Sequence, residues 1–183
     1  MRTSSGWGKA GWLTAALSAA LAAGVVQASD STRHEAQAME KAKISLTEAI
    51  RTAEKHGNGM ATSAEYVFKN GNPAYYEVKV LSNDGQRLTG YELNPVTGEV
   101  RKADDEKFEK LFTRLKPNAI QNAPTSLTRA IATAETRSGG KAKEATVNRD
   151  GDQVQYTVEV VKLDGSSEKL KINGSDGKVA SAK

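Results

Sequence analysis

The sequence contains no cysteine and only two histidines, His34 and His56. Without cysteine a disulfide framework is excluded, so the fold has to be stabilised by burying apolar side chains. Nucleophilic catalysis by Ser or Thr usually needs a base within hydrogen-bonding distance, most often a histidine, and this chain has only two candidates for that base. His34 lies in a polar N-terminal stretch, and His56 ends a predicted helix, where the helix dipole stabilises a cation. We therefore do not expect an enzyme.

Long apolar runs are also scarce. The one at about residues 11–26 follows Arg2 and Lys9 and precedes a small-residue site at 26–28 (VQA), which is typical of a secretory signal peptide. A membrane anchor is the weaker interpretation, because the run is shorter than the ~20 residues that a span needs. No cysteine follows to carry a lipid, and no arginine pair precedes the run, which favours Sec export. We expect cleavage after Ala28 and a periplasmic or secreted product with no stable membrane insertion.

A strong charge of one sign is missing as well. Without the two basic residues of the signal peptide, 24 basic side chains face 22 acidic ones. Lys and Arg do not gather in a stripe interleaved with exposed aromatic residues, so no nucleic-acid partner is expected.

What the sequence does contain is an internal repeat. The ten residues from Ser45 (SLTEAIRTAE) recur from Ser126 (SLTRAIATAE), 81 positions later, with eight identities. The pattern Tyr-x-Val-x-Val at 76–80 recurs at 156–160, and an Asp-Gly turn at 84–85 recurs at 164–165. Because a unit of about 55 residues builds only a marginal core, the two copies are expected to support one another.

Each unit is predicted to be a helix followed by antiparallel strands. An apolar i, i+3, i+4, i+7 stripe predicts a helix over about 46–56, which begins with a Ser45–Glu48 capping box and stops at Gly57. Alternating residues then predict strands at about 60–69, 75–80 and 87–93, with a short edge piece at 99–100. The predicted fold class is α+β: two tandem repeats, 44–101 and 126–180, each with one helix on a three- to four-stranded antiparallel sheet.

Three segments lie outside these repeats. Residues 29–43 are polar and are predicted to be a flexible leader or a frayed helix. Residues 104–116 carry Phe and Leu side chains at helical spacing and predict an extra amphipathic helix between the repeats. Residues 117–125 are polar, contain Pro124 and are predicted to be a linker.

Two patterns suggest metal sites only weakly. The His34-Glu35 pair begins like a zinc-peptidase helix, but position 38, where the second histidine would stand, is Ala. Asn148, Asp150, Asp152 and Glu159 have the outline of a calcium loop, yet Gln153 stands where glycine is required. A hairpin turn is the favoured interpretation, so Asp150 and Asp152 are weak candidates and no cofactor is expected.

Outward-facing strand positions are the candidate contacts for a protein partner. The candidates are Tyr75, Glu77, Lys79, Thr157 and Glu159. Tyr76 and its counterpart Tyr156 are predicted to lie in the core, whereas the carboxylates of Glu48, Glu54 and Glu135 are expected on solvated polar faces or caps.

The first repeat combines the helix S-L-T-x-A-I-x-x-A-E, the glycine after it, the hairpin with its YEVKV return strand, and the closing NPVTGEV at 94–100. In these features it resembles the PepSY domain. The second copy departs at its close, where 173–179 reads NGSDGKV. This resemblance implies a non-catalytic extracytoplasmic module like those in propeptides of thermolysin-like metallopeptidases, where it inhibits the peptidase or assists its folding. No peptidase domain follows, so we expect action in trans on a metallopeptidase partner. The alternatives are a small-ligand or cation-binding envelope accessory and a structural envelope protein.

Overall fold

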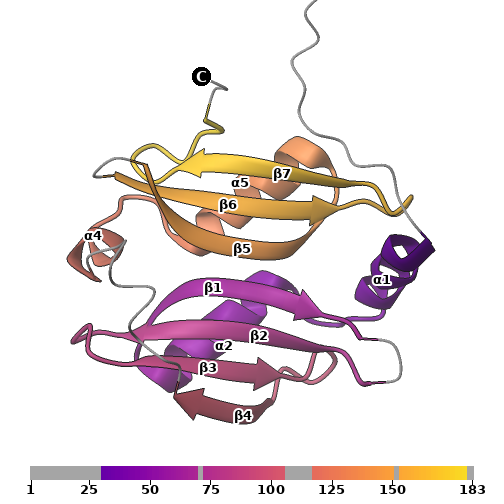
Figure 1. Cartoon of the computed structure of the whole chain (residues 1–183), viewed down its shortest axis with the longest axis horizontal. Helices are drawn as coiled ribbons and strands as arrows, with labels where there is room; N and C mark the ends of the chain where they lie inside the picture. Colours follow the sequence, from indigo (N-terminus) through magenta and orange to yellow (C-terminus); the bar gives the residue numbers. More distant parts are fainter. Residues whose placement is uncertain (1–29, 70–71, 106–116, 151–152, 181–183) are drawn as a thin grey trace, which may run out of the picture.

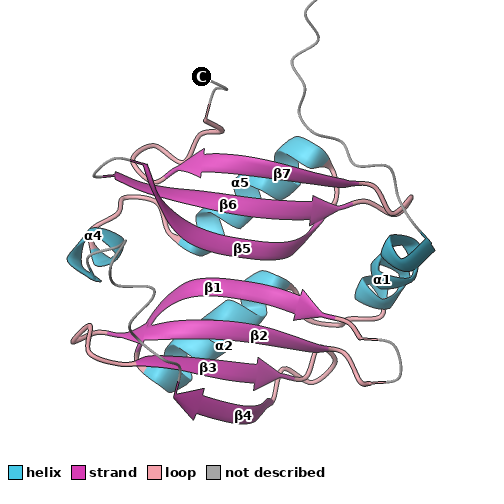
Figure 2. Cartoon of the chain, in the orientation of Figure 1, coloured by secondary structure: helices cyan, strands magenta, loops and turns pink. Residues whose placement is uncertain are grey.

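The computed structural model describes residues 30–69, 72–105, 117–150 and 153–180. It confirms the α+β class, with helices packed on an antiparallel sheet (Figures 1 and 2). In chain order the elements are α1 (Asp30–Glu40), α2 (Leu46–Gly57), β1 (Gly59–Val67), β2 (Tyr75–Ser82), β3 (Leu88–Leu93), β4 (Val100–Asp105), α4 (Pro117–Gln121), α5 (Leu127–Ser138), β5 (Lys141–Asp150), β6 (Gln153–Val161) and β7 (Ser167–Asn173).

The two repeats form a single seven-stranded sheet in the order β4-β3-β2-β1-β5-β6-β7. β1 and β5 join the repeats, with Ala64 directly opposite Ala145. These residues are equivalent, being 81 positions apart, so the repeats meet about a pseudo-two-fold axis at this pair. The sequence predicted two sheets, one in each repeat, and the structure merges them.

The repeated helices begin as predicted, and α2 ends one residue beyond its predicted bound. Ser45 Oγ accepts a hydrogen bond from Glu48 N at 3.2 Å, and Glu48 Oε2 accepts one from Ser45 N at 2.7 Å, which completes the capping box. Gly57, predicted as the stop, is the last helical residue, and Asn58 caps the helix in the left-handed region at φ 45°. Gly57 is required for space instead, because a Cβ there would lie 2.9 Å from Val80 Cγ1.

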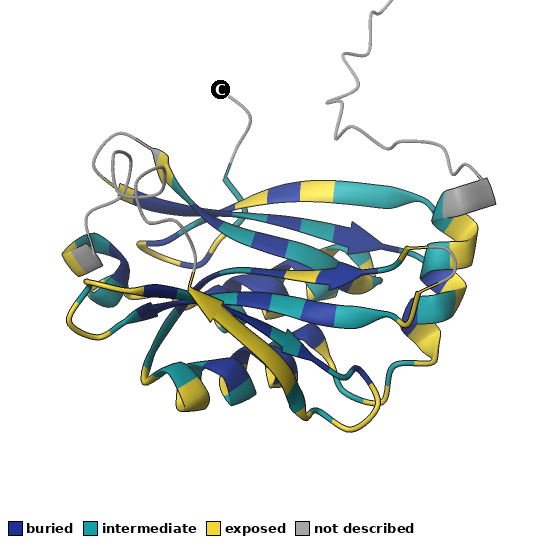
Figure 3. Ribbon diagram, turned by 60° about the horizontal axis from the view of Figure 1, so that its bottom comes forward, coloured by how far each residue is buried: buried dark blue, intermediate teal, exposed yellow. Residues whose placement is uncertain are grey.

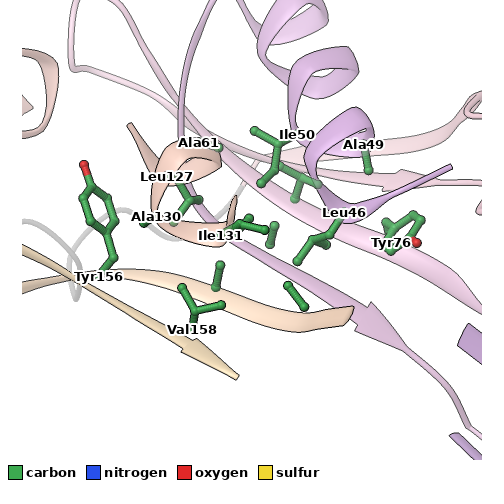
Figure 4. Packing of buried hydrophobic residues seen from close by; sticks show 14 of the residues in the cluster. Leu46, Ala49, Ile50, Ala61, Tyr76, Leu127, Ala130, Ile131, Tyr156 and Val158 are labelled. Atoms are coloured by element: carbon green, nitrogen blue, oxygen red, sulfur yellow. The ribbon is translucent and has the colours of Figure 1, made fainter. Parts of the chain in front are cut away.

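The buried side chains of both repeats form one continuous hydrophobic cluster. The apolar stripes of α2 and α5 pack on the same side of the sheet, and the two helices contact each other (Figure 4). Tyr76 and Tyr156 are buried as predicted, with exposed fractions of 4% and 2%. Sharing one core answers the size problem, because neither repeat has to bury enough apolar surface alone.

Helices occupy parts of residues 29–43, predicted as a flexible leader or frayed helix, and of residues 117–125, predicted as a linker. α1 occupies much of the first segment, with Ala36 and Met39 buried, and α4 occupies part of the second, with Ile120 buried. Residues 36–40 and 117–121 are again 81 positions apart, and α1 and α4 lie at opposite ends of the β1–β5 junction (Figure 1). Each repeat unit therefore begins with a short brace ahead of its main helix.

β4 is longer than the edge piece predicted at 99–100. It reaches Asp105, so Asp104 and Asp105, predicted to begin the connecting helix, instead pair with Gly90 and Thr89. The rest of that predicted helix, 106–116, lies outside the described residues, as does the predicted signal peptide. Within the described ranges, no helix has the length and apolar character needed to cross a membrane.

Candidate functional site

The candidate site is the sheet face opposite α2 and α5, which we call the open face. Burial alternates along the strands: Val78 and Val80 are buried, whereas Glu77 and Lys79 between them are partly exposed. Figure 3 shows the same alternation of buried and more exposed residues along the strands. Because successive side chains on a strand point to opposite faces, the charged set lies on the open face.

A row of charged residues crosses the open face through all seven strands, each residue directly opposite the next. From β4 to β7 its members are Lys102, Glu92, Glu77, Glu65, Glu144, Glu159 and Lys169. We call its five central members, all glutamates, the acidic row.

Lysines neutralise the outer parts of the acidic row. Lys169 Nζ lies 2.9 Å from a Glu159 carboxylate oxygen, Lys79 Nζ lies 3.4 Å from Glu77, and Lys102 Nζ lies 3.8 Å from Glu92. Lys102 also contacts Asp104. The carboxylate of Glu159 raises the pKa of Lys169 by accepting a hydrogen bond from it.

The centre of the acidic row is electrostatically less favourable. Glu65 stands between Glu77 and Glu144, and like charges directly opposite on a sheet are destabilising. The pKa of Glu65 is raised, first by burial and then by the charge of Glu144, while Lys143 acts in the opposite direction. This part of the face therefore holds negative charge at a cost in folding stability.

α1 adds one more ion pair beside the row. Glu35 of α1 accepts a hydrogen bond from Lys143 Nζ of β5 at 2.9 Å, and both side chains are largely buried. Burial lowers the pKa of Lys143, but the hydrogen bond and charge of Glu35 outweigh that effect and raise it. The pair fixes α1 against the second repeat.

The structure brings some of the predicted contact residues into this site. Glu77 and Glu159 belong to the acidic row, and Lys79 and Thr157 lie on the same strands two residues away. Tyr75 begins β2, opposite Val67. β2 and β6 are separated by β1 and β5, so the two groups do not touch directly.

Sequence reasoning missed three central members, Glu65, Glu92 and Glu144. Their outward strand positions were a usable signal, but aligning them required the register between strands. The pairing of β1 with β5 was the decisive unknown, because only that pairing places Glu65 opposite Glu144.

The carboxylates expected on solvated surface have structural roles. Glu54 Oε1 accepts a hydrogen bond from Ala61 N at 2.9 Å, and Glu135 Oε1 accepts one from Ala142 N at the same distance. Burial raises the pKa of Glu54 despite the hydrogen bond from Ala61, which lowers it. These two carboxylates therefore satisfy strand backbone donors rather than simply facing solvent.

The structure offers little support for a metal centre. Asp150 ends β5 and Asp152 lies outside the described residues, so their predicted calcium loop stays a prediction. Among the side chains that can be described, no group of three or more His, Asp or Glu is arranged to hold a metal ion.

Comparison with known proteins identifies the first repeat. Residues 43–104 match the family model described as "Peptidase propeptide and YPEB domain", or PepSY. No curated protein matches the sequence. Among solved structures, a lipoprotein candidate from Clostridium difficile 630 is 21% identical, over 79% of this chain and 96% of that one, with a TM-score of 0.46. The family match spans α2, β1 to β3 and most of β4. The match is thus to a PepSY domain within residues 43–104, the first repeat of this chain.

Proposed function

We propose that the chain is a non-enzymatic binding module that acts outside the cytoplasm on a separate peptidase, which it inhibits or helps to fold. The family match supports this assignment, because the family description names peptidase propeptides. The docking surface in this proposal is the open face, with the acidic row at its centre.

The acidic row is the observation that carries the proposal. Glu65 and Glu144 face each other and the pKa of Glu65 is raised, so the fold is less stable for keeping both charges. A partner with basic side chains at matching positions removes that repulsion on binding. Electrostatic complementarity of this kind speeds encounter and selects the right partner.

The exposed strand edge is a less suitable docking surface. β4 forms one edge of the sheet and is exposed along most of its length (Figure 3). It carries Arg101, Lys102, Asp104 and Asp105, and charged edge strands discourage the addition of another strand. Docking on the face therefore fits this chain better than strand addition at β4.

The direct test uses residues 29–183 with purified metallopeptidases from the same source and compartment. We expect the chain to slow hydrolysis by one of them or to raise its refolding yield. Replacing the two central carboxylates, Glu65→Gln with Glu144→Gln, is expected to weaken the effect about tenfold, as for the loss of roughly two charge contacts. Glu99→Gln, in the exposed β3–β4 turn, is the control and should change nothing.

A stability measurement excludes unfolding as the reason for lost binding. Because the pKa of Glu65 is raised, the folded state holds its proton more tightly than the unfolded state, and stability falls as the pH rises through that pKa. Glu65→Gln should therefore keep or raise Tm at pH 7, and the gain should vanish below about pH 4. A lower Tm at pH 7 would contradict this electrostatic account. If the chain changed neither the hydrolysis rate nor the refolding yield of any peptidase tested, the proposed function would be contradicted.

A further inference from the structure

The corner where α5 meets β5 in the second repeat contains a groove of about 300 Å³. Its lining residues are Ala36, Met39, Glu40, Gly139, Gly140, Lys141, Val161, Lys162 and Leu163. Leu163 is 76% exposed and belongs to the β6–β7 turn, where a large apolar side chain gains nothing by facing water. The groove lies away from the acidic row, at the α1 end of the sheet.

The first repeat has the same corner in a closed form. Asn83 N donates to Asn58 O at 3.2 Å, Asn83 Nδ2 donates to Asn58 Oδ1 at 3.3 Å, and Gln121 Nε2 donates to Asn83 O at 2.7 Å. These three hydrogen bonds connect the helix cap, the β2–β3 turn and α4.

At the groove, a different residue stands at each of the three positions that close the other corner. Gly139 stands for Asn58, Leu163 for Asn83, and Glu40 for Gln121, and none of the three bonds has a counterpart among these described residues. Glu40 instead pairs with Lys141 at 2.8 Å. The internal comparison therefore shows three hydrogen bonds across this corner in one repeat and a groove lined partly by apolar side chains at the same place in the other.

We propose that this groove binds a bulky apolar side chain of a protein partner that carries a carboxylate in the next residue. A volume of 300 Å³ is at the bottom of the range for small-molecule sites, about 300–1,000 Å³, and suits one anchoring side chain. Met39, Val161 and Leu163 supply apolar contact around it.

Lys162 supplies the positive charge available at the rim, because Glu40 already pairs with Lys141 at 2.8 Å. The side chains of Lys141 and Lys162 are 52% and 37% exposed, and the ion pair of Lys162 with Glu168 is long, at 4.0 Å. Lys162 can therefore turn towards an added carboxylate while losing little ion-pair energy with Glu168. The inference goes beyond the proposed function, since it concerns a different surface and does not require the partner to be a peptidase.

The test measures binding of short peptides to residues 29–183 by amide shifts in NMR. The probe is acetyl-Phe-Glu-amide, and the expected result is saturable shifts at Gly139, Gly140 and Leu163. Acetyl-Ala-Glu-amide should bind about tenfold more weakly because it lacks the apolar anchor. Acetyl-Phe-Lys-amide should bind about two- to fivefold more weakly because its charge is reversed.

Two variants check the assignment. Gly139→Asn with Leu163→Asn restores the polar residues of the first repeat and should weaken binding of the Phe-Glu probe about tenfold. A Cβ at Gly139 meets nothing within 4 Å, and asparagine tolerates the φ of 71° found there. Lys162→Gln should preserve the fold and remove the preference for Glu over Lys. Val96→Asn, at an exposed turn in the first repeat, is the control.

Three results would overturn the inference: no saturable shifts at the groove, equal binding of all three peptides, or tighter binding of decanoate than of the Phe-Glu probe. The last would assign the groove to a small amphiphile. Because no peptidase enters this experiment, its failure is distinguishable from failure of the proposed function.

Discussion

At the scale of single residues, the side chains that recur between repeats make the same hydrogen bonds in both. Glu54 and Glu135 each accept a hydrogen bond from the backbone of the following strand. Tyr76 OH donates to Ile44 O at 2.8 Å, and Tyr156 OH donates to Thr125 O. Burial raises the pKa of Tyr156 to about 12, so its hydroxyl stays protonated as a donor. Each repeat thus fixes its helix to its sheet with a carboxylate and a phenol.

Replacing the carboxylate tests this role. Glu54→Ala leaves the Ala61 N–H without its acceptor in a partly buried position, and the expected loss is about 1–3 kcal/mol in the free energy of unfolding. Lys55→Ala, at the next and exposed position, is the control and should stay within about 0.5 kcal/mol. Urea denaturation measures both, and equal effects would mean that Glu54 is ordinary solvated surface.

At the scale of elements, the sequence predicted what local periodicity determines. The main helix and the first three strands of the first repeat follow from a four-residue apolar stripe, caps and alternating strand residues, and they lie within a few residues of the predicted bounds. The second repeat has the same stripe and the same inward positions, and it forms the equivalent α5, β5, β6 and β7. α1 and α4 were not predicted as braces, because α1 is mostly polar, α4 has only five residues, and each buries few apolar side chains. Their stability comes from contacts with the rest of the fold, which periodicity does not report.

The buried side chains of the braces provide the test at this scale. Met39→Ala and Ile120→Ala each remove a side chain that is at most 5% exposed, so each should lower the free energy of unfolding by about 2–5 kcal/mol. Met60→Ala, at a partly buried position of β1, should cost less. A Met39→Ala effect within about 0.5 kcal/mol in urea denaturation would restore the flexible leader that the sequence suggested.

At the scale of the whole molecule, the pseudo-two-fold junction places both candidate surfaces. It aligns five glutamates from two repeats into one row, and α1 and α4 lie at its two ends. Neither arrangement can be read from one repeat, because the pairing of β1 with β5 joins residues about 80 positions apart. The sequence could therefore predict that the candidate site consists of outward-facing strand residues. It could not predict that these residues align in one row.

The junction also predicts how one repeat behaves alone. In a fragment of residues 43–105 the β1 edge is unpaired, and a second copy can supply the missing strand because Ala64 and Ala145 are equivalent about the axis. In that dimer Glu65 faces Ser63 of the other copy, which removes the repulsion between Glu65 and Glu144. We expect the fragment to dimerise in analytical ultracentrifugation, while residues 29–183 stay monomeric at equal concentration because β5 already covers the β1 edge. A folded fragment that stays monomeric would show that three residue pairs are too few to hold the repeats, and that the shared core and the braces carry the junction.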